Sequence, residues 1–474
     1  MLAQSLGGPM ERIVMPGAQH EQIGAFFKSQ ALVGFPPPLP PTFRLFDSSP
    51  RRCFGTSVPK PPSALTPFAV SDRMNTVGRV AARPTQCYGG DRMDFTFNED
   101  QSAVIDAVRE FCDEDLAPKA QETDEAGRWP AENVRKLAEL DLMGIPVPEE
   151  YGGLGMDFLT WSAVGEELSR ACTTTGAVYG AHVLCVYPIM LFGTEAQKKK
   201  YLPPLAQGEH IGAFGLTEPG AGSDAGSVST KADKDGDHYI LNGTKIFITN
   251  GGEAQTYVII ANVDPSKGTR GMTAFIVEKG TPGFEFGKNE KKMAYPSLPN
   301  RELVFTDCRV PKENILGRER GGFLVAMRTL GVGRIGMAIG AVGLARAALE
   351  AAIPYSKRRV QFGKPISSFQ AIQFMIADMA TEIDAARLLT WRAAWLKDQG
   401  KPFEREAAMA KLYASETAMR VTTKAVQIFG GYGYTKEFPV ERYMREAKLF
   451  EIVEGTSEIQ RLVIANQVLR GSSE

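Results

Sequence analysis

The spacing of hydrophobic residues divides the chain after residue 92 into three regions. Residues 93–210 show the three-to-four-residue spacing of amphipathic helices, residues 211–318 change to the period of two that is typical of strands, and residues 319–474 return to long helical patterns. This order predicts an α+β protein with an N-terminal helical domain, a middle β domain and a C-terminal helical domain.

Local signals predict individual elements within these regions. Asn98 stands where it can cap a helix that carries Ile105 and Val108 on one face. Residues 239–241 and 245–248 flank Asn242-Gly243, which predicts a hairpin with a tight Asn-Gly turn. Further strands are predicted at residues 257–261, 272–278 and 301–305.

Residues 1–92 differ from the rest of the chain. Prolines cluster near residues 36–41 and 59–62, and acidic residues are scarce relative to Lys and Arg. Two interpretations stay open: a basic, acid-poor targeting segment, or a non-native extension ahead of a true start at Met93. We expect disorder in either case.

Composition excludes several classes of function. Lys and Arg number 54 against 55 Asp and Glu, a formal net charge of -1, which gives no support for a nucleic-acid binder or a polybasic membrane-surface protein. No apolar run approaches the roughly 18 residues that cross a bilayer, so we expect no membrane insertion. The 6 cysteines lack C-x-x-C spacing and the 4 histidines form no ligand pattern, so we expect no metal site and a reducing compartment.

Residues 331–336 spell Gly-x-Gly-x-x-Gly, the letters of a dinucleotide-binding fingerprint. That motif needs a preceding strand and a βαβ unit, whereas the flanking residues here are helical in pattern. We expect instead that the glycines allow helices to approach one another closely.

Three glycine-rich segments carry candidate chemistry, at residues 214–226, 427–434 and 452–461. The first is either an anion-contacting loop or a surface loop, and the second is either a contact site or a helix C-terminal turn. In the third, Thr456 can cap a helix. There Glu454 is either a solvated loop carboxylate or a base whose pKa is raised by an apolar pocket.

In this order and spacing the three segments resemble the acyl-CoA dehydrogenase family, from about Met93 to Arg470. Residues 333–336 and 454–461 are most similar to the short-chain (butyryl-type) branch. The resemblance implies an N-terminal helical domain, a middle β-barrel or sandwich domain and a C-terminal four-helix bundle. It also implies FAD-dependent α,β-dehydrogenation of an acyl-CoA thioester to the trans-2-enoyl-CoA.

The resemblance assigns the site residue by residue. Glu454 is implied as the base for the α-proton, while the hydride goes to flavin N5. Substrate contacts are implied for Ser223, Arg334 and Gly455. Flavin contacts within one subunit are implied for Phe214, Leu216, Thr217, Gly222, Ser223, Phe247, Ile248 and Thr249. Contacts to the cofactor of a neighbouring subunit are implied for Arg359, Gln361, Phe362, Phe369, Gln370, Gln427, Gly430 and Gly431, with Thr456 and Glu458 on the pyrophosphate side.

The resemblance also implies partners. They are acyl-CoA, electron-transfer flavoprotein and further copies of the chain in a homotetramer (a dimer of dimers). The compartment would be the cytoplasm in a bacterium or the mitochondrial matrix in a eukaryote. Two alternatives remain: an acyl-CoA oxidase that passes electrons to oxygen, and a non-catalytic acyl-CoA- or flavin-binding relative, against which the intact Glu454 argues.

Some positions depart from the family pattern. Gly331 replaces a common Asp, Val453 stands where Tyr is frequent, and the loop 294–300 lacks the usual residues. The change at Gly331 puts one substrate-side polar contact in doubt. Val453 and the loop 294–300 suggest an acyl group other than plain butyryl, such as a branched, alicyclic or aromatic one. Some branches carry their base at the position of Gly333, which cannot serve here, so Glu454 is the stronger candidate.

Overall fold

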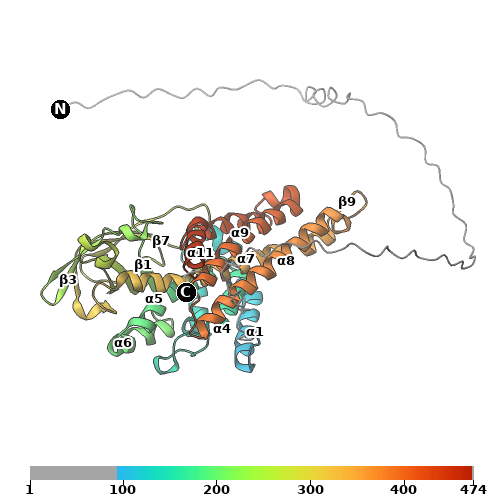
Figure 1. Cartoon of the computed structure of the whole chain (residues 1–474). Coiled ribbons are helices and arrows are strands. Elements are labelled where there is room, and N and C mark those ends of the chain that lie inside the picture. The colour runs from blue at the N-terminus through green and yellow to red at the C-terminus, as the bar shows by residue number, and fades with distance from the viewer. Residues whose placement is uncertain (1–92, 472–474) are drawn as a thin grey trace, which may run out of the picture. The chain divides into compact units, whose positions relative to one another are not determined.

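The computed structural model describes residues 93–471. Along the chain a helical region is followed by a sheet and then by a second helical region, which confirms the predicted fold class (Figure 1). The predictions for residues 1–92 lie outside the described residues.

The N-terminal region begins with the predicted cap. Asn98 accepts a hydrogen bond from the Gln101 backbone N–H at 2.8 Å, and the Gln101 side chain accepts one from the Asn98 N–H at 2.9 Å. The α-helices are α1 (Glu99–Phe111), α2 (Ala120–Ala126), α3 (Ala131–Glu139), α4 (Phe158–Ala171), α5 (Thr173–Phe192) and α6 (Glu195–Ala206).

The middle region forms one mixed sheet in the order β6-β7-β3-β2-β4-β5-β8, with β1 added in parallel to β4. Every residue of β4 is buried, because helices such as α5 and α7 pack beside this part of the sheet. The strands are β1 (Gly212–Gly215), β2 (Lys231–Asp235), β3 (His238–Thr249), β4 (Thr256–Asn262), β5 (Met272–Glu278), β6 (Phe284–Asn289), β7 (Asn300–Pro311) and β8 (Ile315–Leu316).

The predicted Asn-Gly hairpin is wrong, because β3 runs straight through it. The register with β7 shifts between Leu241 and Gly243, which is the mark of a bulge. A Cβ on Gly243 would lie 2.8 Å from the Thr230 Cα, and Asn242 Oδ1 accepts a hydrogen bond from the Asp307 N–H at 2.8 Å. The glycine is therefore needed for close backbone approach rather than for a turn.

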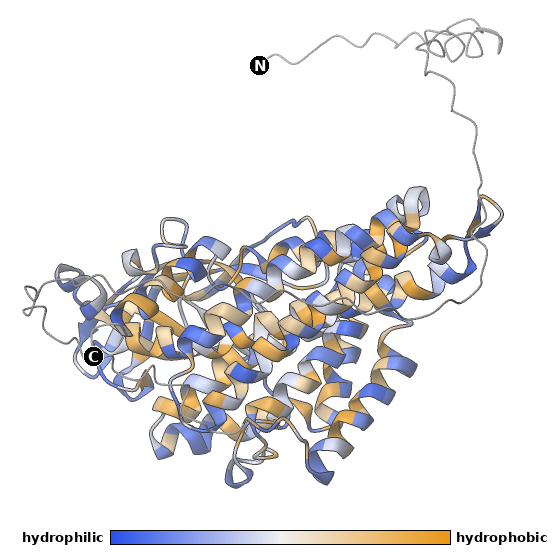
Figure 2. Ribbon diagram, turned by 45° about the vertical axis from the view of Figure 1, so that its right-hand side comes forward, coloured by the Kyte–Doolittle hydropathy of each residue, from blue (hydrophilic) through white to orange (hydrophobic). Residues whose placement is uncertain are grey.

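The C-terminal region is built around the long helix α7, which packs on α4, α5, α8 and α9. Figure 2 shows hydrophobic residues concentrated where the helices face one another. The elements are α7 (Gly322–Arg358), β9 (Val360–Gln361), β10 (Lys364–Pro365), α8 (Gln370–Asp398), α9 (Glu404–Phe429), α10 (Val440–Phe450) and α11 (Ser457–Gly471).

The Gly-x-Gly-x-x-Gly sequence lies inside α7, as predicted. Its last glycine and one beyond it admit neighbouring side chains: a Cβ on Gly336 would lie 3.0 Å from Trp161, and one on Gly340 would lie 2.8 Å from Phe450. Close helix packing explains these glycines without a nucleotide.

Two helices, α5 and α7, are long and apolar enough to cross a membrane, with mean hydropathy 1.5 in each case. The expectation that no apolar run approaches this length was therefore wrong. Of these apolar stretches 61% and 67% are buried inside the protein, which is the pattern of helices surrounded by other elements.

Candidate active site

Glu454 lies in the short segment that joins α10 to α11, with a left-handed backbone at φ 52°. Its side chain reaches α7 at Gly333, where an added Cβ would lie 2.0 Å from Glu454 Oε2 and 2.8 Å from Leu184 Cδ2 of α5. The carboxylate therefore occupies the space above a residue that has no side chain.

The backbone around Glu454 is held by side chains from two helices. Lys411 Nζ on α9 donates to the Gly455 carbonyl oxygen at 2.7 Å. Gln460 Nε2 on α11 donates to the Gly455 carbonyl at 2.8 Å and to the Glu454 carbonyl at 3.2 Å. Thr456 Oγ1 accepts from the Ile459 N–H at 3.3 Å, so Thr456 caps α11 as predicted.

The electrostatic setting of Glu454 suits a base. Burial raises the pKa of its carboxyl to about 7, although the positive charges of Lys411 and Arg334 act in the opposite direction. Oε2 is buried and makes no hydrogen bond to any described residue. Arg334 is itself 7% exposed with an unbonded Nε, so one cation and one carboxylate oxygen here retain free hydrogen-bonding capacity.

The end of β3 presents an aromatic residue to solvent. Phe247 is 59% exposed although its backbone is left-handed, at φ 58°. Asn300 Nδ2 on β7 donates to Thr249 Oγ1 at 2.9 Å, which fixes the position of this half-buried hydroxyl. The side chain of Ile248 points the other way into the core, so only its backbone faces the same side as Phe247.

A buried ion pair fixes the loop that follows β1. Lys245 Nζ donates to Glu218 Oε1 at 2.7 Å and to the Leu216 carbonyl at 3.1 Å, with both charged side chains almost fully buried. Glu218 also accepts from Ser229 and Thr230, and these donors together with Lys245 hold the pKa of its carboxyl at about 2 against the effect of burial.

The other predicted residues of this loop differ in how far they are buried. Phe214 and Thr217 are half-buried, and the Thr217 carbonyl accepts from the Ile246 N–H at 2.9 Å, which joins the loop to β3. Gly222 and Ser223 are exposed at the tip.

A second group of predicted residues lines a pocket of about 450 Å³ where α7 ends and α9 ends. Arg359, Gln361, Gly430 and Gly431 all lie in its wall, and the Arg359 guanidinium sits 5.4 Å from the centre of the Tyr432 ring. The other predicted members of the group do not line this pocket: Phe362 lies between β9 and β10, Phe369 and Gln370 at the start of α8, and Gln427 near the end of α9.

The two groups lie apart in one chain. Lys411 beside Glu454 and Phe429 beside the second pocket are on the same helix, roughly 27 Å apart at 1.5 Å per residue. Figure 1 shows β9 at the end of the helical region away from β3.

Several residues of the site were not anticipated from the sequence. Lys411 falls on the buried stripe of α9 that carries Ala407, Ala414 and Ala418, so a lone lysine at helical spacing on an alanine face was an available signal. Lys245, Glu218, Asn300 and Gln460 gave no comparable signal, because their partners are distant in sequence.

Side chains of the loop 294–300 form hydrogen bonds to the helices α2 and α10. Tyr295 is buried and its hydroxyl donates to the Glu446 carbonyl of α10 at 3.3 Å, while Ser297 bonds the Thr123 carbonyl of α2. Of this loop, Asn300 is the residue that reaches Thr249.

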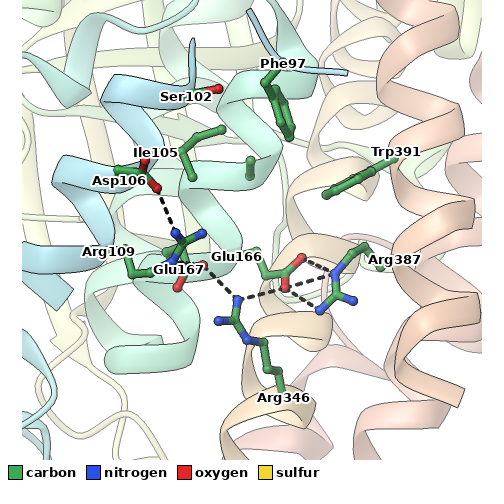
Figure 3. Close-up of a pocket in the computed structure, with 11 residues that line it drawn as sticks. Phe97, Ser102, Ile105, Asp106, Arg109, Glu166, Glu167, Arg346, Arg387 and Trp391 are labelled. Atoms are coloured by element: carbon green, nitrogen blue, oxygen red, sulfur yellow. Dashed lines mark hydrogen bonds and ion pairs between the residues drawn. The ribbon is translucent and has the colours of Figure 1, made fainter. Parts of the chain in front are cut away.

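A further pocket, of about 390 Å³, lies between α1, α4, α7 and α8 (Figure 3). Its charges pair with each other: Glu166 accepts from Arg387 at 2.7 Å, and Glu167 accepts from Arg346 at 2.8 Å. Arg346 and Arg170 hold the pKa of Glu167 below its ordinary value although burial acts to raise it. This internal neutralisation indicates a structural network between helices.

Family models match most of the described chain. They are the "Acyl-CoA dehydrogenase, N-terminal domain" at residues 98–209, the "middle domain" at 213–308 and the "C-terminal domain" at 320–469.

Individual relatives agree with these matches. The "Acyl-CoA dehydrogenase, short-chain specific" of Clostridium acetobutylicum is 52% identical over 379 residues, covering 80% of this chain and 100% of the relative. The "Short-chain specific acyl-CoA dehydrogenase, mitochondrial" of Mus musculus is 48% identical, covering 78% of this chain and 90% of the relative. A solved structure described as "Electron transferring flavoprotein of Acidaminococcus fermentans: Towards a mechanism of flavin-based electron bifurcation" has a chain 55% identical. Its TM-score is 0.79, over 80% of this chain and 100% of that one.

Proposed function

This chain belongs to the acyl-CoA dehydrogenase family of oxidoreductases, and on that premise we propose that it oxidises a short-chain acyl-CoA with Glu454 as the base. Relatives that are named short-chain specific support the short-chain function, and the family implies FAD as the cofactor. One observation carries the proposal: the Glu454 carboxylate lies above Gly333 with Oε2 unbonded.

The proton transfer needs a carboxylate that is available and basic. The α-proton of a thioester is weakly acidic, so a base near pKa 7 combines ionisation at neutral pH with proton affinity. The C–H bond breaks and the proton moves to Oε2, which leaves Glu454 neutral in its apolar surroundings. The Glu454 backbone N–H bonds no acceptor among the described residues and is available to the thioester carbonyl oxygen.

The chain offers surfaces that fit FAD. Phe247 is an exposed ring held outward by a left-handed backbone, next to the oriented hydroxyl of Thr249. We propose that this pair, with Leu216, Thr217, Gly222, Ser223 and Phe214 on the adjoining loop, receives the flavin. When bound, FAD supplies the oxidant for the hydride that leaves the β-carbon. Arg334, Gly455 and Ser223 are proposed to contact the substrate.

A second copy of the chain is proposed to complete the cofactor site. Arg359, Gln361, Gly430 and Gly431 line a pocket at the end of α9, roughly 27 Å along that helix from Lys411 beside Glu454. Phe362 beside it is 93% exposed and Tyr434 is 89% exposed, and such apolar surface typically meets a partner. The expected assembly is a homotetramer, with Phe369, Gln370, Gln427, Thr456 and Glu458 also near the cofactor.

The acyl group and the later steps belong to the same proposal. Val453, half-buried beside Glu454, leaves apolar space for a branched, alicyclic or aromatic acyl group. Electrons are proposed to pass to electron-transfer flavoprotein, in the cytoplasm of a bacterium or the mitochondrial matrix of a eukaryote.

We also propose domains at residues 93–210, 211–318 and 319–474.

The base is tested with Glu454→Gln in the FAD-loaded protein. This variant should keep its yellow colour and bind acyl-CoA but fail to bleach when substrate is added anaerobically. Glu416→Gln removes a carboxylate of α9 that pairs with Arg461 at 2.6 Å, and it should bleach normally. Normal bleaching in Glu454→Gln would reject the base.

The substrate is tested by anaerobic titration with a panel of acyl-CoA thioesters, following flavin absorbance. Strong preference for butyryl-CoA over every bulkier thioester would reject the enlarged acyl pocket. Oxygen reduction as fast as reduction of an artificial acceptor would identify an oxidase.

A further inference from the structure

Lys411 is an unusual residue for its position. It is 0% exposed on α9, among Ala407, Ala414 and Ala418 on the buried stripe of the helix. Burying a lysine is costly unless the ammonium is paired and hydrogen-bonded. Among residues 93–471, its Nζ donates at 2.7 Å to one acceptor, the carbonyl of Gly455, which directly follows Glu454.

The turn that Lys411 contacts is strained. Glu454 and Gly455 have consecutive positive φ values, 52° and 93°, and a left-handed backbone is unfavourable for glutamate. Lys411 and Gln460 fix the carbonyls of this turn from opposite helices. The fixed backbone directs the Glu454 side chain toward Gly333, where Oε2 stays free of hydrogen bonds.

We infer that Lys411 is a positioning residue for Glu454: it holds the Glu454-Gly455 turn through the Gly455 carbonyl and places a buried positive charge beside the carboxylate. The inference rests on the proposed role of Glu454 and adds a residue that acts through it. Lys411 thereby favours the ionised form of the carboxylate in surroundings that favour its neutral form.

Other charges face the pair from each element that packs against it. Arg334 extends from α7, Glu451 follows α10 and Glu458 lies at the start of α11, while α5 contributes the apolar Leu184. Lys411 and Arg334 both act to lower the pKa of Glu454, with Lys411 the stronger of the two. Burial lowers the pKa of Lys411 itself to about 8, so it remains largely charged at pH 7.

Three variants separate the charge of Lys411 from its hydrogen bond. Lys411→Gln keeps a donor for the Gly455 carbonyl but removes the charge, so the midpoint of the pH profile for flavin bleaching should rise by about one unit. From a midpoint near 7, this lowers the ionised fraction of Glu454, and with it the rate at pH 7, about fivefold. Gln460→Leu removes a neutral donor, so the maximal rate should fall while the midpoint stays. Lys411→Arg keeps the charge and should keep the midpoint.

A readout without substrate completes the test. The carboxyl band of Glu454 is identified by infrared difference against Glu454→Gln, and its titration should shift upward by a similar amount in Lys411→Gln. Lys424→Met, which removes a lysine of the same helix that pairs with Asp378 and Glu382 at the surface, should shift neither measurement. Coincidence of the wild-type and Lys411→Gln titrations would overturn the inference, whatever the rates.

A wrong assignment of Glu454 as the base can be distinguished from a wrong role for Lys411. If Glu454→Gln still bleaches, Glu454 is not the base. The infrared titration nevertheless shows whether Lys411 acts on Glu454, and an unshifted band overturns the inference. If Lys411→Gln loses FAD, the infrared titration is repeated on Lys411→Met in the presence of excess FAD. The same upward shift in the titration of the Glu454 band is expected there.

Discussion

The Glu454 carboxylate and Gly333 occupy complementary positions, since Oε2 lies 2.0 Å from the point where a Cβ on Gly333 would stand. Glu454 supplies the candidate base, and Gly333, which has no side chain, leaves the space that the carboxylate occupies. The absence of a side chain at 333 is therefore part of the site, although Gly333 is 121 positions earlier in the chain and lies in α7.

Gly333→Ala should displace the carboxylate. The added methyl group meets the mobile end of Glu454, which can move away, rather than fixed backbone. We expect the rate of anaerobic flavin bleaching to fall on the order of 100-fold, because misplacement of a reacting group by about 1 Å can have that effect. Stopped-flow absorbance in the FAD-loaded protein measures the rate.

Gly331→Ala is the matched control for this substitution. A Cβ there meets the Phe403 ring at 3.5 Å, an ordinary contact, in the same helix. Both substitutions favour the helix by up to about 1 kcal/mol, but the methyl group of Gly333→Ala also lies 2.8 Å from Leu184 Cδ2, so only Gly331→Ala is expected to keep the melting temperature in full. An equal loss of rate in both variants would contradict the steric explanation.

Glu454→Gln should stabilise the protein at higher pH. In the folded protein burial raises the pKa of Glu454 to about 7, whereas an unfolded chain has about 4.3. At a pH between these two pKa values, Glu454 is protonated in the folded protein and ionised in the unfolded chain. The free energy of unfolding therefore falls as the pH rises, and this loss is complete above pH 7. Glutamine cannot ionise and avoids this penalty.

The measurement is the difference in free energy of unfolding between wild type and Glu454→Gln at two pH values. We expect a gain on the order of 1–3 kcal/mol at pH 8 and a much smaller one at pH 4.5. Glu446, whose pKa burial also raises to about 7, is present in both proteins and cancels. A gain that is independent of pH would argue against a raised pKa.

The pair of Lys245 and Glu218 should hold the loop and the sheet together. Lys245→Met leaves a buried carboxylate without its cation, so we expect a loss of about 3–5 kcal/mol in the free energy of unfolding, together with weaker FAD retention. Lys288→Met breaks a pair of similar length, 2.6 Å, whose lysine is 63% exposed, and should lose at most about 1 kcal/mol. Similar losses in both variants would show that burial does not matter here.

The sequence was sufficient for the three regions, because helical and strand spacing are local patterns, whereas the role of Glu454 as the base came from the family resemblance and remains a prediction. Helical spacing, the Asn98 cap and the segment around Glu454 are readable within a few residues. The hairpin at Asn242-Gly243 was wrong because its explanation, the close approach of Thr230, is a contact between strands. Lys411 and Asn300 were missed for the same reason, since their partners become neighbours only in the folded chain.

Arg359→Ala should weaken both cofactor retention and assembly. Arg359 lines the second pocket with Gly430 and lies over the Tyr432 ring, far from Glu454 in the same chain. If a neighbouring copy brings this pocket to the cofactor, loss of the guanidinium removes a charge-assisted partner for a diphosphate. We expect at least a tenfold faster loss of FAD on dilution, together with a shift of mass away from four times 51.6 kDa in light scattering.

Arg358→Ala provides the comparison, because Arg358 is equally exposed and one residue earlier but does not line this pocket. It should keep FAD and assembly unchanged. Because the pocket is proposed to serve the partner's cofactor, mixing Arg359→Ala with an excess of Glu454→Gln should produce hybrid dimers. In these, the copy carrying Arg359→Ala keeps an intact base and receives an intact pocket from its neighbour. Bleaching should then recover above the level of Arg359→Ala alone, and the absence of recovery in mixed assemblies would place the pocket's role within its own chain.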